Sequence, residues 1–516
     1  MPSKIYSAAT IGLDAEKVEI ECDAGAGQFC FVIVGLPDTA VQEARERVRA
    51  AIKNSGFSFP RGRVTVNLAP ADIKKQGSIY DLPIALSILL ADKDSALNGE
   101  CEKQRALEGM YCGELSLEGL VRPISGAITI AHLARTAGFA SLFVPRENAA
   151  EAALIEGIDV YPVATLTQCI EHLMGVNILE KYDRSNALVD FSNEAQGATT
   201  LDIAYIKGQQ HAKRALEIAA AGGHNILLSG QPGSGKTMLA RVIPTLLPPL
   251  PLQEALEVTR IYSVSGMMPP GQHLIRIRPF RSPHHTASVA SIIGGGSAPS
   301  PGEVSFAHRG VLFLDEFPEF PRSAIEALRQ PLEDGWVTIT RSAGSIRFPA
   351  RCMLVAAQNP CPCGNSGSTL RECICSSGAL YAYQRKISGP ILDRIDLFVD
   401  VPAVEYGDLF SLEAGEKSSV VRHRVADARA LQSCRYEGTG LCVNSEIGPH
   451  HIESLCPLDA VTRLFMQSAA ERLRLSARSY SRIVKISRTI ADLDGCESIR
   501  QSHIAEALQY RPAVAS

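Results

Sequence analysis

The residues best suited to chemistry form a glycine-rich segment that fits the pattern G-x-x-x-x-G-K-[ST]. The segment consists of Gly230, Gln231, Pro232, Gly233, Ser234, Gly235, Lys236 and Thr237. Its glycines let backbone N–H groups wrap phosphate oxygens, and the dipole of a following helix favours anions. We expect Lys236 to reach the β- and γ-phosphates of ATP and Thr237 to hold Mg²⁺. The strand-like run Asn225–Leu228 and the helical run Met238–Leu247 flank the segment, which argues against an incidental glycine-rich turn.

Two adjacent acids provide the second half of such a site. Asp315 and Glu316 follow the apolar run Val311–Leu314, and open α/β sheets bind ligands at the carboxyl ends of their strands. We expect Asp315 to orient the Mg²⁺ shell and Glu316 to polarise the attacking water. Two solvated acids at a strand end are the alternative. Asn359 follows another apolar strand and is placed to contact the γ-phosphate or the water, unless it only forms an Asx-Pro turn.

Four of the 14 cysteines crowd into one short stretch. They form two C-x-C pairs with nine residues between the pairs, and they are Cys361, Cys363, Cys373 and Cys375. Four thiolates suit tetrahedral Zn²⁺ in a closed structural site. Because C-x-C is less usual than C-x₂-C, reduced thiols near the nucleotide site are the alternative. We expect a structural zinc rather than a catalytic one.

Hydrophobic periodicity indicates the elements that position these residues. Residues 1–175 alternate strand-like and helix-like runs, which predicts an α+β or α/β domain with its own core. A polar linker follows over 176–200. Residues 201–404 carry short apolar runs that suit a parallel sheet covered on both faces. A connector over 405–432 leads to a helical domain over 433–516, so the predicted fold class is α/β with a helical lid.

Individual elements are expected at defined positions. The expected strands are Lys17–Cys22, Gln28–Val34, Arg63–Leu68, Leu142–Val144, Asp159–Pro162, Asn225–Leu228, Val311–Leu314 and Met353–Ala356. The expected helices are Thr39–Ser55, Leu82–Leu90, Leu458–Arg472, Ala477–Asp494 and Ser498–Tyr510.

Composition limits the class of protein. The chain has 516 residues, of which 46% are hydrophobic and 21% charged, which predicts a globular protein of about three domains. The net charge of −4 excludes a globally basic nucleic-acid binder but leaves room for a local basic surface. No run of apolar residues is long enough for a transmembrane helix, and no secretory signal is expected at the N-terminus. Scattered thiols then favour the cytoplasm.

The ordered motifs resemble those of the AAA+ ATPases and, more closely, the magnesium-chelatase-like YifB/ComM family. Beside the glycine-rich segment and the acidic strand, the resemblance rests on motifs spread over nearly the whole chain. These motifs are Gly35–Val41, Val64–Asp72, Arg278–Thr286, Ala307–Glu316, Asn359–Gly364 and Ser388–Asp396. The resemblance implies a homo-oligomeric ring, expected to be a hexamer, with ATP between neighbouring subunits.

The same resemblance assigns three residues to ATP hydrolysis. Asn359 matches the first sensor, Arg394 the arginine finger offered to the next subunit, and Arg478 the second sensor on the helical lid. An arginine supplied in trans stabilises charge that develops in the transition state. For Arg394 the alternative is an ion pair within the subunit, with Asp393 or Asp396. For Arg478 it is one solvated charge among many.

Clusters of basic residues bear on the substrate. One lies between the glycine-rich segment and the acidic strand, one on the expected hairpin Trp336–Arg341 and Gly344–Phe348, and one along a basic helical run near the C-terminus. The first comprises Arg276, Arg278, Arg281, His284 and His285, and the third comprises Arg472, Arg474, Arg478, Arg482, Lys485 and Arg488. Cationic loops that face a pore would suit a phosphate backbone. Ordinary surface arginines are the alternative.

The N-terminal domain resembles the protease domain of the Lon family through Gly113–Ile124. That domain uses a serine–lysine dyad, but the matching positions lie near Tyr80 and Asp81 and near Ile128. The resemblance therefore implies a non-proteolytic module, as in the RadA branch-migration helicases. Its basic residues are a candidate DNA-facing surface, and they are Arg45, Arg47, Arg49, Lys53, Arg61, Arg63, Lys74 and Lys75.

The leading hypothesis is an ATP-driven ring motor, a helicase that promotes branch migration in homologous recombination or natural transformation. Its expected cofactors are ATP, Mg²⁺ and a structural Zn²⁺. Its expected partners are single-stranded and branched DNA, with recombination proteins as candidates. A magnesium-chelatase-type motor subunit, an ATP-dependent protease and a remodeller of protein complexes are the alternatives.

Overall fold

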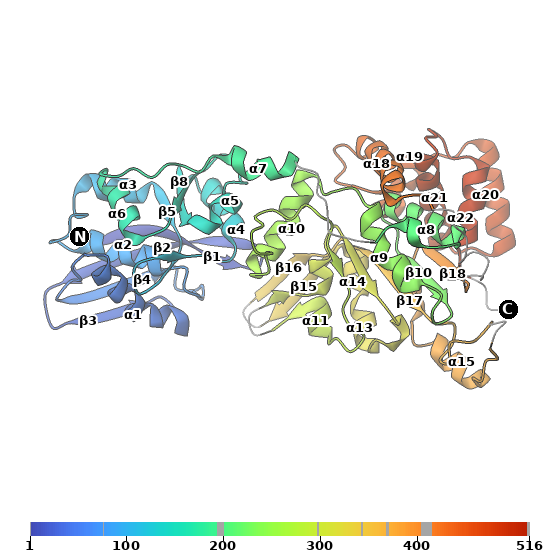
Figure 1. Cartoon of the computed structure of the whole chain (residues 1–516), viewed down its shortest axis with the longest axis horizontal. Helices are drawn as coiled ribbons and strands as arrows, with labels where there is room; N and C mark the ends of the chain where they lie inside the picture. Colours follow the sequence, from blue (N-terminus) through green and yellow to red (C-terminus); the bar gives the residue numbers. More distant parts are fainter. Residues whose placement is uncertain are drawn as a thin grey trace. The chain divides into compact units, whose positions relative to one another are not determined.

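The computed structural model describes residues 2–75, 77–192, 201–296, 299–341, 344–367, 371–403 and 415–512 (Figure 1). The chain divides into two units. The first contains Met1–Ala195 together with Leu252–Arg276, and the second contains Gln196–Pro251 together with Ile277–Ser516.

A seven-stranded mixed sheet forms the first unit. In spatial order its strands are β3 (Cys30–Val34), β4 (Arg63–Ala69), β2 (Asp14–Gly25), β1 (Ser3–Ile11), β5 (Gly109–Tyr111), β8 (Ser141–Pro145) and β9 (Asp159–Val163). On β2, alternation of apolar and polar residues buries one face, as Val18, Ile20 and Cys22 show, whereas all three residues of β5 are buried. Each strand expected in this region overlaps one of these.

Helices of the first unit cover the buried face of this sheet. In α1 (Thr39–Asn54), Asp38 caps the helix by accepting a hydrogen bond from the Val41 N–H, and the buried residues recur at helical spacing. In α2 (Asp81–Ala91), every residue from Asp81 to Leu90 is buried, and the sequence is apolar apart from Asp81 and Ser87. The remaining helices of this unit are α3 (Glu100–Leu107), α4 (Ala127–Thr136), α5 (Ala149–Ala152) and α6 (Leu166–Met174).

Residues Leu252–Arg276 join the first unit, although the residues on both sides of them in sequence belong to the second. Their helix α10 (Leu252–Val264) packs against α4. The Gly126 N–H lies 3.0 Å from Ser263 Oγ, and the Ser263 hydroxyl donates to the buried Glu151 carboxylate. This stretch lies within the predicted ATPase domain over 201–404, so the residues of that predicted domain are divided between the two units.

Two segments expected to be irregular contain helices. Helix α7 (Arg184–Ser192) lies within the expected linker 176–200, whose last residues, 193–200, fall outside the described ranges. Helix α18 (Ser418–Arg435) lies mostly within the expected connector 405–432. Its apolar stripe is only Val421, Val425 and Ala428, which the many charged residues between them conceal in the sequence. Residues 404–414 fall outside the described ranges.

A five-stranded parallel sheet forms the centre of the second unit and confirms the predicted fold class. Its spatial order is β11 (Phe280–Arg281), β14 (Val311–Leu314), β17 (Met353–Gln358), β10 (Ile226–Gly230) and β18 (Leu397–Val401). All four residues of β14 are buried, as a strand covered on both faces requires. Helices α8 (Gln210–Gly222) and α9 (Lys236–Leu246) pack beside β10 and share its core.

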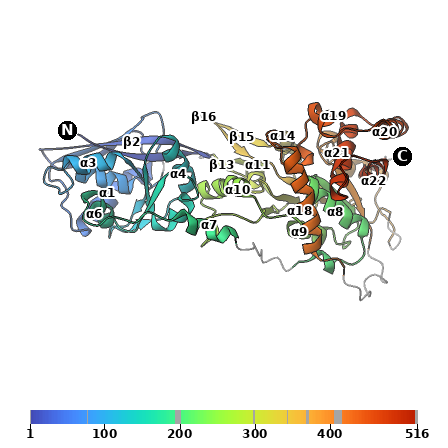
Figure 2. The same cartoon turned by 90° about the horizontal axis from the view of Figure 1, so that it is seen from above.

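The C-terminal helices pack onto the same core as this sheet. They are α18, α19 (Ile452–Leu455), α20 (Ala460–Leu473), α21 (Ala477–Leu493) and α22 (Gln501–Ala507). Helix α18 runs along α8 and α9 (Figure 2), and the core that contains Leu228 of β10 also contains Ile486 and Ile490 of α21. No helix in the described ranges combines the length and apolar character needed to cross a membrane.

Candidate nucleotide site

The glycine-rich segment connects β10 to α9 by a tight turn. Gly230 ends the strand and Lys236 begins the helix. Gly233 and Gly235 have φ angles of 79° and 87°, a left-handed conformation that residues with a Cβ rarely adopt. The turn directs the first N–H groups of α9 towards the carboxyl end of the sheet, which is the arrangement that binds phosphate.

Lys236 is folded back over this turn. Its Nζ donates to the carbonyl oxygens of Gly230 at 2.6 Å and Gln231 at 2.9 Å, and lies 3.2 Å from Oδ1 of Asn359. Only 7% of the residue is exposed. Burial lowers the pKa of Lys236 below its ordinary value, while the Asp315 carboxylate acts in the opposite direction. The structure therefore brings Asn359, at the end of β17, to the lysine of the glycine-rich turn.

Thr237 and Asp315 meet across the two strands of the site. The Thr237 hydroxyl donates to Oδ2 of Asp315 at 2.8 Å. A hydroxyl and a carboxylate are oxygen ligands of the kind that Mg²⁺ uses beside nucleotide phosphates. The hydroxyl of Ser234 is buried and has no hydrogen-bond partner within the described part of the chain. The turn thus fits a phosphate group, which would give this hydroxyl an acceptor.

Glu316 projects beside this pair. Its backbone is left-handed, with φ of 51°, and its side chain is 54% exposed. Oε2 lies 3.4 Å from Nδ1 of His285, whose ring contacts that of His284 at a centroid distance of 4.1 Å. Both histidines belong to the basic cluster that the sequence predicts to face DNA. Only the fold reveals that His285 contacts Glu316, because 30 residues separate them and no spacing pattern links them.

Two arginines of the same segment have structural partners, which corrects the expectation that they face DNA. Arg278 is buried and donates to the carbonyl oxygens of Pro248 and Arg309, both at 2.8 Å. Arg281 forms a two-pronged pair with the Glu303 carboxylate at 2.6 and 2.7 Å. These contacts of the two guanidinium groups stabilise the fold of the chain next to β11.

Arg394 lies at the amino ends of the parallel strands, whereas the glycine-rich turn lies at their carboxyl ends. Strands β10 and β18 are parallel, with Ile226 beside Leu397 and Gly230 beside Val401. Arg394 precedes β18, and its carbonyl oxygen accepts a 2.8 Å hydrogen bond from Nδ2 of Asn225, which precedes β10. The turn that holds Lys236 follows β10. The length of the strand therefore separates Arg394 from the phosphate turn of its own subunit.

The side chains of Arg394 and Arg478 converge on a third residue. Arg394 forms an ion pair with Glu333 and donates to the Pro390 carbonyl at 2.6 Å. Arg478 lies 3.6 Å from Glu333 and 3.2 Å from Asp393. The intrasubunit ion pair of Arg394 thus has Glu333 as its partner rather than Asp393 or Asp396. The Arg478 side chain is 48% exposed, so its contacts with Glu333 and Asp393 lie at the surface. Neither arginine contacts the phosphate turn within the described residues.

Asn225 and His224 fasten this edge. The Asn225 Oδ1 accepts from the Leu354 N–H of β17 at 2.8 Å, while its backbone N–H donates to Asp396. His224 is buried, with Nε2 2.8 Å from the Thr489 hydroxyl of α21 and Nδ1 3.4 Å from Asp396. One polar network thus joins the arginine loop, the strand before Asn359 and the lid.

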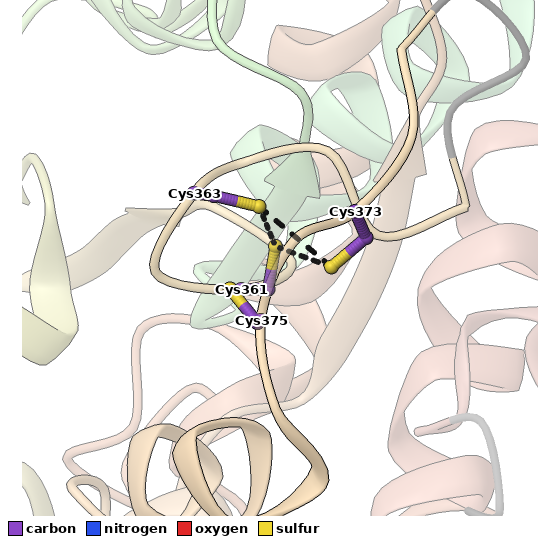
Figure 3. Close-up of side chains that lie close together, drawn as sticks. All are labelled: Cys361, Cys363, Cys373 and Cys375. Atoms are coloured by element: carbon purple, nitrogen blue, oxygen red, sulfur yellow. Dashed lines mark hydrogen bonds between the residues drawn. The ribbon is translucent and has the colours of Figure 1, made fainter.

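The four clustered cysteines lie together beside the phosphate turn (Figure 3). The sulfur of Cys361 is 3.4 Å from that of Cys363 and 3.8 Å from that of Cys373, and all four sulfurs lie within 4.8 Å of one another. Tetrahedral zinc, with Zn–S near 2.3 Å, places its sulfurs roughly 3.8 Å apart, so the four thiols fit this ion. A Cβ on Gly364 would lie 2.5 Å from the Pro232 ring, so this loop rests on the phosphate turn.

Other basic residues divide into two groups. On α21, Arg482 donates to the Asp393 carbonyl, Lys485 to the Ser445 carbonyl, and Arg488 to Asp492, so these three stabilise the fold. The expected hairpin is present as β15 (Trp336–Arg341) and β16 (Gly344–Pro349), and it exposes Arg347. Among the basic residues that the sequence suggested, the hairpin therefore carries an exposed cation.

The N-terminal unit carries no serine–lysine dyad at the expected place. Tyr80, Asp81 and Ile128 are all buried. Ser78 donates to Glu114, and the buried Lys75 donates to the Pro70 carbonyl.

Two of the basic residues suggested as a DNA-facing surface are occupied within this unit. Arg47 pairs with Asp81 at 2.8 Å, and Lys75 is buried. Neither side chain is therefore placed to bind a phosphate backbone.

Three family models match the chain. They are described as magnesium chelatase, subunit ChlI, over residues 202–409; subunit ChlI of Mg-chelatase, over 18–148; and magnesium chelatase, subunit ChlI C-terminal, over 415–511. Together they cover both structural units.

Individual proteins match over different shares of the chain. The competence protein ComM of Haemophilus influenzae is 42% identical over 99% of this chain and 97% of its own length. The protein YifB of Escherichia coli is 40% identical over 99% of this chain and 97% of its own length. The magnesium-chelatase 67 kDa subunit of Heliobacterium mobile is 26% identical over 45% of this chain and 38% of its own length.

Proposed function

This chain belongs to the magnesium-chelatase-like YifB/ComM family of AAA+ ATPases, and we propose that it is an ATP-driven ring motor that acts on DNA. The observation that carries the proposal is the separation of the two halves of the ATP machinery. Lys236, Thr237 and Asp315 stand at one edge of the parallel sheet and Arg394 at the other. A subunit built in this way completes its site only with a neighbouring copy.

The residues of the first edge have distinct roles in hydrolysis. Bound ATP with Mg²⁺ supplies the phosphoanhydride bond and neutralises part of the phosphate charge. Lys236 binds the terminal phosphates, and Thr237 with Asp315 holds the metal shell. Glu316 projects past this pair and orients water for attack, with its carboxylate beside His285. Asn359, already in contact with Lys236, is placed to donate a hydrogen bond to the terminal phosphate.

The residues of the second edge act on the neighbour. The contact of Arg478 with Asp393 places it beside Arg394, so both arginines belong to the surface that meets the next subunit. Head-to-tail contacts of this kind close into rings when the rotation between subunits allows it, and a hexamer is the proposed state. The guanidinium of Arg394 then stabilises the charge that develops as the phosphate bond breaks.

The cysteine cluster completes the site as a structural element. We propose that Cys361, Cys363, Cys373 and Cys375 hold one Zn²⁺. Four thiolates would leave a bound Zn²⁺ no open coordination position for substrate, so the cluster would serve a structural role. The four cysteines would then hold in place the loop whose Gly364 rests on Pro232 of the phosphate turn.

DNA is the substrate that the comparisons favour. The nearly full-length match to a protein named for competence points to DNA uptake or recombination, where branched intermediates must be moved. The exposed Arg347 on the β15–β16 hairpin supplies a cation for a phosphate backbone. Branch migration of recombination intermediates by translocation on DNA is therefore the proposed activity.

A magnesium-chelatase motor is the second candidate, because all three matching family models carry that name. The match to the chelatase subunit covers less than half of either chain, whereas the match to ComM covers nearly all of both. The full-length relationship therefore favours the DNA motor.

Migration of a labelled four-way junction tests the proposal. With ATP and Mg²⁺ the purified protein is expected to convert the junction into duplex products. Lys236→Ala is the matched control and is expected to be inactive. If the junction is neither bound nor converted while ATP is hydrolysed, the DNA assignment is wrong and the ATPase assignment stands.

A further inference from the structure

The two arginines of the second edge hold an anion that belongs to their own subunit. Only 8% of the Arg394 side chain is exposed, and its Nη1 and Nη2 donate to Pro390 and Glu333. Its Nε is buried without a partner among the described residues. Arg478 approaches the other oxygen of the same Glu333 carboxylate at 3.6 Å. One carboxylate thus lies between the two guanidinium groups that belong, in the proposed function, to the surface facing the neighbouring subunit.

We propose that the Glu333 carboxylate occupies, in the free subunit, the place that a phosphoryl group of ATP on a second copy of this chain takes in the ring. Carboxylate and phosphate present the same feature to arginine, a pair of anionic oxygens that accept parallel N–H donors. A phosphoryl group brings a third oxygen and more charge, and the unpartnered Nε of Arg394 is a donor that Glu333 leaves unused. The phosphate is therefore the stronger of the two ligands once it arrives.

The position of Glu333 suits such an exchange. It lies near the end of the short helix α14 (Arg329–Asp334), and its side chain is 54% exposed although its partner Arg394 is not. Its carboxylate can therefore turn into solvent without opening the core. The pair keeps Arg394 neutralised until ATP occupies the adjoining subunit, so assembly of the ring is coupled to nucleotide.

The inference rests on the proposed function, because it needs a ring in which Arg394 meets a neighbour's ATP. It predicts that removing the Glu333 charge changes ring assembly in the direction opposite to that expected for a structural ion pair. If Glu333 competes with ATP, loss of its charge must make assembly easier. If Glu333 serves to hold Arg394 in its working position, loss of its charge must make assembly and turnover harder.

Glu333→Gln in the full chain tests this difference. Assembly is followed by mass photometry as a slowly hydrolysed ATP analogue is titrated. The concentration for half-maximal assembly is expected to fall about three- to tenfold, the range for a partly exposed to partly buried ion pair. Glu326→Gln is the matched control and is expected to leave assembly unchanged, because Glu326 pairs with Arg329 and contacts neither Arg394 nor Arg478 within the described residues.

A double variant assigns the effect to the arginine. Arg394→Ala combined with Glu333→Gln is expected to assemble as Arg394→Ala alone does. Thermal melting checks folding, and if Glu333→Gln melts early, Glu333→Asp decides with a smaller shift in the same direction. If the unaltered chain forms rings and folded Glu333→Gln assembles equally well or more weakly, the inference is wrong. Absence of rings from the unaltered chain would instead overturn the proposed function.

Discussion

Mixing two inactive variants tests whether Arg394 acts on a neighbour. In Arg394→Ala the phosphate turn is intact and the arginine is missing, while in Glu316→Gln the arginine is intact and hydrolysis is blocked. The five residues of β10 span roughly 15 Å, and Arg394 lies at the far end of that span from the phosphate turn. Its side chain cannot cover this distance to the ATP of its own subunit.

The magnitude follows from the ring. Loss of an arginine of this kind lowers turnover by about 10³- to 10⁵-fold, so each variant alone is expected to be nearly inactive. In an equimolar random mixture, about one quarter of the head-to-tail contacts pair an intact Glu316 with an intact Arg394. ATP turnover of the mixture is therefore expected to recover to about one quarter of the unaltered level if the sites work independently.

Steady-state phosphate release measures this recovery, with each variant alone as the baseline. Arg394→Ala must still bind a fluorescent ATP analogue, because its phosphate turn is unaltered. A mixture that stays at the baseline although mixed rings form would refute the reasoning. Full turnover by Arg394→Ala alone would do so as well.

Three further outcomes follow from single substitutions. Lys236→Ala is expected to weaken binding of a fluorescent ATP analogue, and unchanged affinity would contradict its role. Cys373→Ser is expected to remove the zinc that elemental analysis should find at about one per chain and to lower the thermal midpoint, whereas the exposed Cys434→Ser should do neither. Asn225→Ala leaves the buried Leu354 N–H without its acceptor and should lower the free energy of unfolding by about 1–3 kcal/mol in urea titrations. A decrease in unfolding free energy smaller than the error of that titration would show that the hydrogen bonds of Asn225 do not stabilise the amino ends of the parallel strands.

The sequence predicted what depends on short-range pattern. The run Val311–Leu314 is a strand because four apolar residues in succession suit a sheet covered on both faces, and the structure has that strand with the same bounds. The glycines of the phosphate turn predict their own backbone conformation, because few other residues adopt it.

What the sequence left unpredicted depends on contacts between distant residues. Helix α18 has a narrow apolar stripe, which can be recognised as the buried face only from its packing against α8 and α9. Residues Leu252–Arg276 join the first unit through Ser263 and Glu151, which are 112 residues apart. Glu333 carries no motif at all, and its contact with Arg394 spans 61 residues. The sequence places Arg278 and Arg281 in a basic cluster suited to a phosphate backbone, because a charge pattern does not reveal the partners that these side chains have in the fold.

The rate of ATP hydrolysis with and without DNA tests the central claim most directly. Single-stranded DNA and a four-way junction are each added to the purified chain, with Glu316→Gln as the control for contaminating ATPases. The account predicts that DNA raises the rate of the unaltered chain several-fold and leaves the control inactive. An ATPase rate that DNA does not change, together with no DNA binding at low salt, would contradict it.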